Sequence, residues 1–379
     1  MEKAFAHLFS QVHQPFFIVG IFHAIVVMII FMLGYKGIIA LDISSIDFHA
    51  YSLIYLVFTN FFIGFVFTTF PRFCGHAPIE NRYYSIVFWM FQLGSLLFLV
   101  GAFVSLYVVG FGLAVHLLAL FLVIFQLQKI FLKTNKNMQD DPKWILIAFY
   151  LGLIGILAYI NYFFTATFNP FGFVFYFYFI FLTFVIAQRM VPFFSHSRAP
   201  KNIYLAPIFF MALLVKVTCH NFFGSLEPFI DIIIGAWIFV EIRKWDVSLK
   251  GMADILKILH LGLYWLVFGF IGGGVISLIT EAPLMQLQIH IFSLGFVTVM
   301  LIGFGTRVTL GHSGRTPHAD NFTKRIFYAL HILVVVRILF SLLFGHNFFW
   351  LFDLSVFLWV VVLIIWGARY IPMLAKPMK

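Results

Sequence analysis

The feature that most constrains this chain is a succession of apolar runs of about 20 residues, which begins at Phe16 and continues to Ile371. At about 1.5 Å of rise per residue, a helix of that length crosses a hydrocarbon core of roughly 30 Å. Hydrophobic residues make up 63% of the 379 residues and charged residues only 10%, which excludes a water-soluble enzyme and a disordered chain. The sequence therefore predicts an all-α polytopic membrane bundle.

The apolar runs divide into twelve predicted membrane spans, which together form a single transmembrane domain over residues 1–379. The third and fourth spans are the least clearly divided, because only Val109, Gly110 and their neighbours separate them. The predicted spans are 16–35, 50–70, 85–107, 111–129, 143–164, 171–191, 203–223, 228–243, 255–279, 284–306, 322–344 and 348–371.

The basic residues support this division, because short cytoplasmic loops are rich in Lys and Arg whereas external loops are not. Of the 24 Lys and Arg residues, 21 fall in the two tails or in the loops after even-numbered spans. The exceptions are Lys36 in an outer loop, and Lys216 and Arg337 inside spans. Both termini are therefore predicted to be cytoplasmic.

The formal net charge of +10 follows from this topology and does not indicate nucleic-acid binding, since so apolar a chain has no polar face to hold a nucleic acid. The expected partner is the lipid bilayer. Residues Met1 to Phe17 lack the pattern of a cleaved signal peptide, so the first span is expected to be retained.

Three predicted cytoplasmic helix ends have similar sequences, around His76, His196 and His312. These histidines are 120 and 116 residues apart and follow spans 2, 6 and 10, which suggests three four-helix units. Such an arrangement is similar to the three arcs of four helices in haem-copper oxidases. The alternative is that any helix leaving a membrane ends in Arg, small residues and Pro.

The 14 histidines equal the Asp and Glu residues in number, and in a membrane each must be paired or liganded. Their positions in the spans separate them into two depths. Near the external face we expect His49, His116, His220, His290 and His346. Toward the cytoplasm we expect His23, His260 and His331, with His13, His76, His196, His312 and His318 at the surface below them.

Two axial histidines of one haem must lie at similar depth, because both Nε2 atoms approach a single iron. His260 and His290 differ in depth by on the order of 15 Å and cannot share an iron. His290 can pair with His49 or His116, and His260 can pair with His23 or His331. We therefore predict a b-type haem near the external face, bound by His290 with His49 or His116 opposite.

Lys216 and Arg337 lie in the outer halves of their spans, where an unpaired charge costs at least about 2.5–3.5 kcal/mol. Both need anionic partners. Asp231, at the start of span 8, is a candidate for one of them. A haem propionate is a candidate for Arg337, since bidentate arginine–carboxylate contacts are strong in low dielectric.

The segment Gln288 to Arg315, QIHIFSLGFVTVMLIGFGTRVTLGHSGR, resembles the hallmark of the NnrS family. Other stretches match in the same order across essentially the whole chain: HQPFF from His13, DFHA from Asp47 and then Phe70-Pro71, RMVPFFS from Arg189, and LHLGLYW from Leu259. The matching motif residues are His13, His49, His260, His290, Arg307, His312 and Arg315.

The resemblance implies a twelve-helix protein of the bacterial cytoplasmic membrane that binds haem and copper and is linked to nitric oxide or nitrosative stress. It implies no established reaction, and it places Arg307 with the cofactor-binding residues. A respiratory component is a candidate electron donor. The chain departs from the family at His49-Ala-Tyr51-Ser52, where members usually read His-x-His-Glu, and at His76, where Arg is more usual.

A copper ion or a second haem is expected at the cytoplasmic side, held by His260 and His312 with help from His13 or His76. Imidazole suits copper, and Cys74 could add a soft ligand for Cu(I). The alternative is that His312 and Arg315 only cap a helix end and meet lipid phosphates.

Two other functions stay open at this point. A haem-copper-oxidase-like electron-transfer protein is one, although the sequence has no His-His and no His-x-His for its copper centre. A proton- or anion-coupled transporter is the other, with Lys216, Arg337 and the histidines lining the bundle and Gly272-Gly-Gly274 as a candidate unwinding point.

Overall fold

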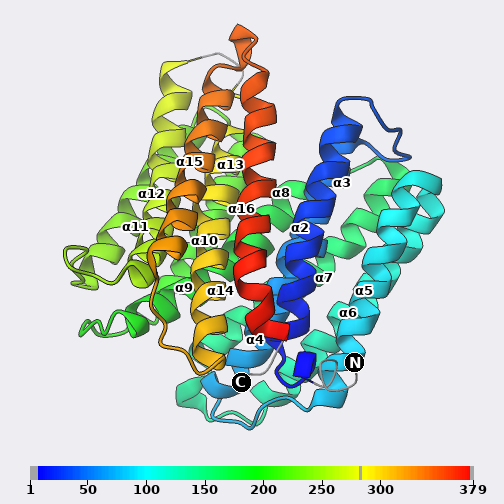
Figure 1. Cartoon of the computed structure of the whole chain (residues 1–379). Helices are drawn as coiled ribbons and strands as arrows, with labels where there is room; N and C mark the ends of the chain where they lie inside the picture. The colour runs from blue at the N-terminus through cyan, green and yellow to red at the C-terminus, as the bar shows by residue number, and fades with distance from the viewer. Residues whose placement is uncertain (1–6, 281–283, 376–379) are drawn as a thin grey trace. The chain divides into compact units, whose positions relative to one another are not determined.

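The computed structural model describes residues 7–280 and 284–375, and within them the chain forms twelve long helical segments and no strand (Figure 1). The all-α prediction is confirmed, and every predicted span coincides with one helical segment whose ends differ by at most six residues. Nine segments are single helices: α2 (His13–Tyr35), α5 (Asn81–Val104), α6 (Leu106–Phe131), α7 (Asp140–Thr165), α10 (Leu205–Phe222), α11 (Glu227–Lys244), α12 (Asp254–Ile279), α15 (Asn321–Leu342) and α16 (Trp350–Ala375).

Among the described residues, eleven of these segments are long and apolar enough to cross a membrane. The twelfth, α11, has 18 residues and carries charges at both ends and at Asp231. Asp231, the fifth residue of α11, has a partner on α10, described below, and a twelfth membrane span at α11 stays a prediction.

The other three segments each contain a π-helical turn, in which the backbone widens to i→i+5 hydrogen bonding. The turn is preceded by a short α-helix and followed by a longer one. The three are α3–η1–α4 (Ser45–Tyr51, Ser52–Phe58, Thr59–Phe73), α8–η3–α9 (Phe171–Val174, Phe175–Ile180, Phe181–Phe194) and α13–η4–α14 (Leu287–His290, Ile291–Thr298, Val299–His312). They are also the most buried of the eleven, with 89%, 78% and 72% of their apolar windows inside the protein against at most 50% elsewhere. We call them the core helices.

All three core helices end in the same way. A left-handed residue stands just past each end, Gly75, His196 and Gly314, and the next N–H bonds back five residues, to Pro71, Pro192 and Leu310. These left-handed residues are 121 and 118 residues apart, from 75 to 196 and from 196 to 314. The repeated pattern of helix ends thus has a structural counterpart.

The three histidines used to find that pattern are not equivalent. His76 follows the left-handed residue of its helix, His196 is that residue, and His312 precedes it by two positions. Aligning the repeats on histidine is therefore wrong in register, because the turn geometry, and not the imidazole, is what recurs.

Spans 3 and 4 are two helices as predicted, but the division lies at Ser105 and not at Val109 and Gly110, which belong to α6. Ser105 is extended and accepts a hydrogen bond from the Tyr107 N–H at 3.2 Å. The two helices pack side by side in Figure 1. A Cβ on Gly101 would lie 2.4 Å from the Val109 nitrogen, so close packing at this hairpin requires glycine.

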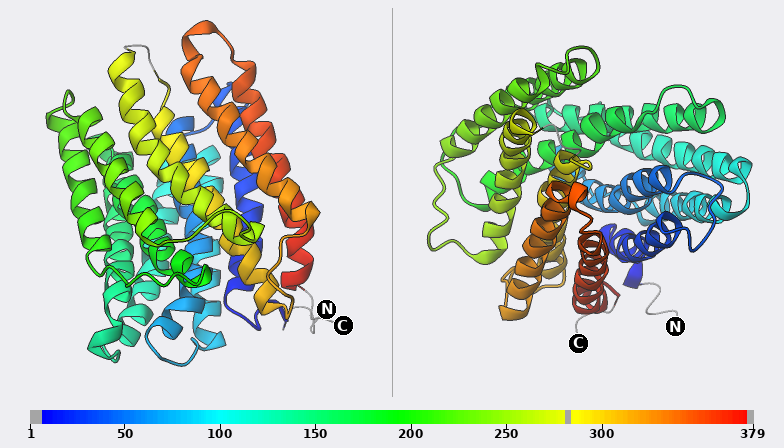
Figure 2. Two further views of the ribbon diagram at one scale, coloured as in Figure 1. Left: turned by 90° about the vertical axis from the view of Figure 1, so that its left-hand side faces the viewer. Right: turned by 90° about the horizontal axis from the view of Figure 1, so that it is seen from above.

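The expected unwinding at Gly272-Gly-Gly274 is wrong, because α12 is a continuous helix from Asp254 to Ile279. Its glycines instead allow groups of neighbouring helices to approach its backbone closely. A Cβ on Gly273 would lie 3.0 Å from the Gln288 side chain, and one on Gly274 would lie 2.6 Å from the Pro228 carbonyl oxygen. Helices α11 and α12 pack along each other in Figure 2.

The chain divides by internal contacts into two compact units. Unit 1 comprises residues 1–182 and 367–379, and unit 2 comprises residues 183–366. In unit 1, α2 packs on the first core helix; in unit 2, α12 and α15 pack on the third. Each unit is described by itself below, and the single transmembrane domain stays a prediction.

Gly101→Ala should destabilise the protein by about 1–3 kcal/mol, because its methyl group would meet backbone atoms that cannot rotate away. Gly172→Ala is the matched control, since a Cβ there meets nothing within 4 Å. Thermal unfolding of the detergent-solubilised protein measures both. Equal melting temperatures for the two variants would contradict the packing argument.

Candidate functional site

His290 ends α13 in unit 2, and Arg337 reaches it from α15. The His290 Nδ1 atom lies 2.9 Å from the Gln286 carbonyl oxygen, and Arg337 Nη2 lies 3.2 Å from His290 Nε2. A carbonyl oxygen only accepts, so Nδ1 carries the proton, and Nε2 offers its lone pair to the guanidinium, which only donates. Arg337 Nη2 is also 3.1 Å from Nδ1, but this contact is no hydrogen bond once Nδ1 is protonated. The ring is held in the tautomer that ligates a metal through Nε2.

The Arg337 guanidinium is buried and contacts neutral acceptors around His290. Its Nη1 donates to the Ser341 hydroxyl at 2.6 Å, and Nη2 lies 3.3 Å from the Met285 carbonyl oxygen. Ser341 in turn donates to the same carbonyl at 3.2 Å. This arrangement places a planar donor fork beside the Nε2 atom of His290, where it could also receive a carboxylate.

In unit 1, His116 is fully buried and both of its ring nitrogens are engaged. Ser95 donates its only hydroxyl proton to the Phe91 carbonyl at 3.0 Å, so its oxygen accepts from His116 Nε2–H, also at 3.0 Å. Nδ1 then accepts from the Tyr51 hydroxyl at 3.0 Å. His116 is thus held in the tautomer opposite to that of His290.

The second candidate partner, His49, lies near the start of the first core helix and stacks on Phe31 with ring centroids 4.0 Å apart. His49 and His116 belong to unit 1, whereas His290 belongs to unit 2. The pairing of His290 with either of them stays a prediction.

The same tautomer argument sorts three further histidines. His23 and His312 each donate Nδ1–H to a backbone carbonyl, of Leu56 and Val308, both at 3.1 Å, which leaves Nε2 with a lone pair. His331 instead accepts at Nδ1 from the Trp265 indole N–H at 3.0 Å, so its proton is on Nε2. His331 is the less suitable of the two partners considered for His260.

The copper candidates occupy both units. In unit 2, His260 is buried with Nε2 2.8 Å from the Ser195 hydroxyl, and His312 ends α14. In unit 1, His13 is buried at the start of α2, and His76 follows the end of α4, two residues after the buried Cys74. Arg307 lies with its guanidinium carbon 4.0 Å from the Phe194 ring centroid.

Within the described parts of the chain, no group of three or more His, Cys, Asp or Glu side chains is arranged to hold a metal ion. The copper site stays a prediction.

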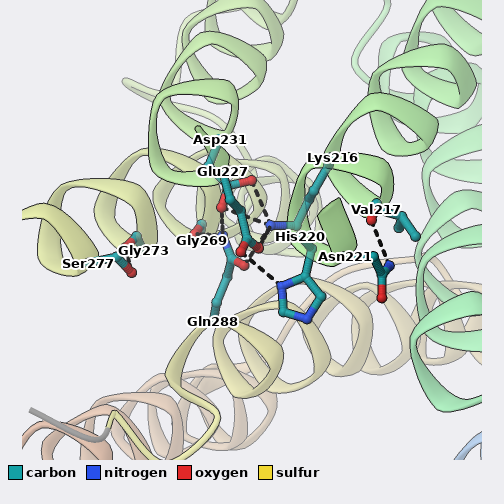
Figure 3. Close-up of polar contacts among 10 residues, drawn as sticks. All are labelled: Lys216, Val217, His220, Asn221, Glu227, Asp231, Gly269, Gly273, Ser277 and Gln288. Atoms are coloured by element: carbon teal, nitrogen blue, oxygen red, sulfur yellow. Dashed lines mark hydrogen bonds and ion pairs between the residues drawn. The ribbon is translucent and has the colours of Figure 1, made fainter. Parts of the chain in front are cut away.

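A polar cluster is centred on Lys216 of α10 (Figure 3). Lys216 is completely buried. Its Nζ atom contacts both carboxylate oxygens of Asp231 at 2.7 and 2.8 Å, Glu227 Oε1 at 3.0 Å and Gln288 Oε1 at 2.9 Å. His220 Nδ1 lies 2.8 Å from Glu227 Oε2. We call these five residues the Lys216 cluster. The predicted pairing of an intramembrane cation with Asp231 is confirmed for Lys216.

Sequence reasoning missed Glu227, Gln288 and His220 in this role. Two of them could have been found by helical spacing: Lys216 and His220 are four residues apart on α10, and Glu227 and Asp231 are four apart on α11, so each pair shares a face. Gln288 carries no comparable signal, because a single amide in an apolar helix has no spacing partner.

A sequence model described as NnrS protein matches residues 7–378 of this chain. The chain belongs to the NnrS family. Its hallmark segment, recognised from Gln288 to Arg315, comprises nearly all of the third core helix together with the left-handed turn that ends it. No curated protein matches the chain. Family membership and the apolar helices together make it a multi-pass membrane protein of the NnrS family.

Asp231→Ala should destabilise the protein by about 3–5 kcal/mol, since it leaves a buried ammonium without its nearest counter-charge. Asp42→Ala, at an exposed position outside the helices, is the control and should change little. Denaturation in detergent micelles gives both values. If Asp231→Ala lowers the free energy of unfolding no more than the surface control does, the Lys216 cluster does not stabilise the fold.

Proposed function

We propose that this NnrS-family protein binds a b-type haem at His290 and uses it to bind or detoxify nitric oxide in the bacterial cytoplasmic membrane. The observation that carries the proposal is the His290 tautomer: Nδ1–H is held by the Gln286 carbonyl, and Nε2 is left as a lone pair beside Arg337. A carbonyl-anchored imidazole is the usual arrangement of a metal-ligating histidine.

The residues at His290 fit a haem in two respects. His290 Nε2 would ligate the haem iron, and the planar Arg337 fork could bind a haem propionate. The neutral acceptors that Arg337 now contacts, Ser341 and the Met285 carbonyl, would keep its guanidinium oriented. When bound, the haem iron supplies the coordination position for nitric oxide or another diatomic ligand.

Ligation by His116, one of the two candidates for the opposing ligand, would require it to give up the hydrogen bond to Tyr51 or that to Ser95 in a fully buried site. Both His116 and His49 stay candidates.

Nitric oxide is small and uncharged, so it can reach the site through the apolar helices without a polar channel. The turn that follows His290 supports this route, because Ile291, Phe292 and Phe296 are completely buried. Detoxification would in addition require electrons, for which a respiratory donor is the candidate.

A copper ion at the cytoplasmic side is the second element of the proposal, with His260 and His312 as ligands and His13 or His76 assisting. His312 supports it most, because its Nδ1–H bonds to the Val308 carbonyl, which puts the lone pair of the ring on Nε2. Cys74 would favour Cu(I) if His76 takes part.

The transporter alternative is weakened by two observations. Lys216 is surrounded by two carboxylates and an amide oxygen, and is thus not open to an anionic substrate. Helix α12 is continuous where a carrier would unwind. An electron-transfer role without nitric oxide binding is separated by the experiment below.

His290→Ala should lower the haem-to-protein ratio several-fold while the protein still inserts, because the axial ligand is lost. His346→Ala, at the exposed end of the short helix η5 (Phe344–His346) in the same unit, is the control and should keep the wild-type ratio. Anaerobic nitric oxide added to reduced wild-type protein should shift the Soret band. An unchanged ratio in both His290→Ala and His49→Ala would refute the haem site, and haem without a Soret shift would favour electron transfer.

A double variant, His260→Ala with His312→Ala, should lose bound copper, because removal of two imidazoles abolishes the proposed coordination. Elemental analysis of the purified protein measures it, with His318→Ala as a surface control. Copper retained at the wild-type level would remove this site from the proposal.

A further inference from the structure

The helix turn that carries His290 begins in an unusual backbone and without a side-chain cap. Met285 and Gln286, directly before it, both have positive φ angles, 25° and 56°, although neither is glycine. The Leu287 N–H bonds back to the Leu284 carbonyl oxygen at 2.8 Å, but no side chain caps α13, and after only four residues the backbone enters the wide η4 turn. Contacts from side chains of this short turn to neighbouring helices therefore matter for its orientation.

Gln288, in the middle of this turn, supplies such a contact (Figure 3). Its Oε1 accepts from Lys216 Nζ at 2.9 Å, and its Nε2 donates to Asp231 Oδ2 at 2.7 Å. Nε2 also lies 3.2 Å from the Gly269 carbonyl oxygen. Both ends of one amide are thus bound by groups from three helices, α10, α11 and α12.

The neighbouring helix is shaped to receive this amide. Gly273 lies against the Gln288 side chain, and a Cβ there would be 3.0 Å from Nε2 and 3.1 Å from Cγ. Lys216 and Asp231 also bond directly to each other, so their ion pair does not require Gln288. The hydrogen bonds of Lys216 and Asp231 to Gln288 therefore fix α13, the helix that carries Gln288.

The position of His290 depends on the rotation of this turn. His290 follows Gln288 by two positions, which corresponds to a rotation of about 200° around a helix. The two side chains therefore point to opposite sides. A side-chain atom about 5–6 Å from the helix axis moves by roughly 2 Å when the helix rotates by about 20°. That displacement is as long as an iron–imidazole bond.

We propose that Gln288, clamped by Lys216 and Asp231, is a positioning residue that sets the direction in which His290 presents Nε2. The inference rests on the proposed function, because His290 must ligate a haem for the direction to matter. The clamp lies on the side of α13 away from Arg337, so it would remain in place if Arg337 bound a haem propionate instead of His290.

The test uses the full-length, haem-loaded protein in lipid nanodiscs and compares Gln288→Leu with wild type. Leucine fills the space against Gly273 but cannot bond to Lys216 or Asp231. Haem transfer to apomyoglobin should accelerate about tenfold, the factor that corresponds to the loss of one charge-assisted hydrogen bond. The ferric electron paramagnetic resonance spectrum should shift from low-spin toward high-spin signals.

The matched control is Gln92→Leu, which removes one partly buried amide that donates to Asn60 Oδ1 at 2.8 Å in unit 1. It should lower the melting temperature without changing the haem spectrum. A merely structural role for Gln288 would give the same result as this control.

An exchange of roles provides a rescue. Gln288→Glu alone removes the donor to Asp231 and adds a carboxylate, so it should disrupt the haem spectrum. Combined with Asp231→Asn, it restores an amide facing a carboxylate at unchanged total charge, and the low-spin signal should return. Lys216 can bond to both groups in either arrangement.

The outcomes separate the two claims. Wild-type protein that binds no haem overturns the proposed function and this inference together. Haem bound at the wild-type ratio, with unchanged transfer rate and spectrum in Gln288→Leu, overturns the positioning role and leaves the haem site intact. Failure of the double variant to restore the signal that Gln288→Glu loses also counts against the clamp.

Discussion

The bilayer requires every buried polar group to find a partner within the protein, and the structure of this chain follows from that requirement. The helices provide hydrogen bonds for the backbone N–H and C=O groups. The charged and imidazole side chains are satisfied one by one, and the partner chosen decides what each can do. Lys216 is neutralised by Asp231 and Glu227, and this cluster in turn holds Gln288 on the helix that bears His290.

The histidines show how much such partners determine. His290, His23 and His312 bond through Nδ1 to backbone carbonyls, whereas His116 and His331 accept at Nδ1 from a hydroxyl or an indole. In each case the bonded partner determines which ring nitrogen carries the proton. Residues of one type, at similar depths, are thereby divided into those suited to ligate a metal and those suited to pack.

The sequence predicted the twelve helices well, because span length, hydropathy and basic loops are local properties. It also predicted a pairing of an intramembrane cation with Asp231, since charge in a membrane demands an opposite charge. It could not predict the three wide turns, which have no composition of their own, or the contact of Gln288 with residues 57 and 72 positions away. The tautomer of His290 depends on a backbone carbonyl and is likewise invisible in the pattern of side chains. The opposing haem ligand and the copper site stay predictions.

The wide turn in each core helix has a consequence for how this chain could diversify. Tyr51, Val174 and His290 each stand immediately before such a turn, at corresponding places in segments that end alike. One of the three is a phenol bonded to a histidine, one is a packed aliphatic side chain, and one is an imidazole whose Nε2 atom faces a guanidinium. The repeated helix form thus provides three equivalent positions, each directly before a wide turn. The side chain at one of these positions can change while the side chains at the other two keep their packing.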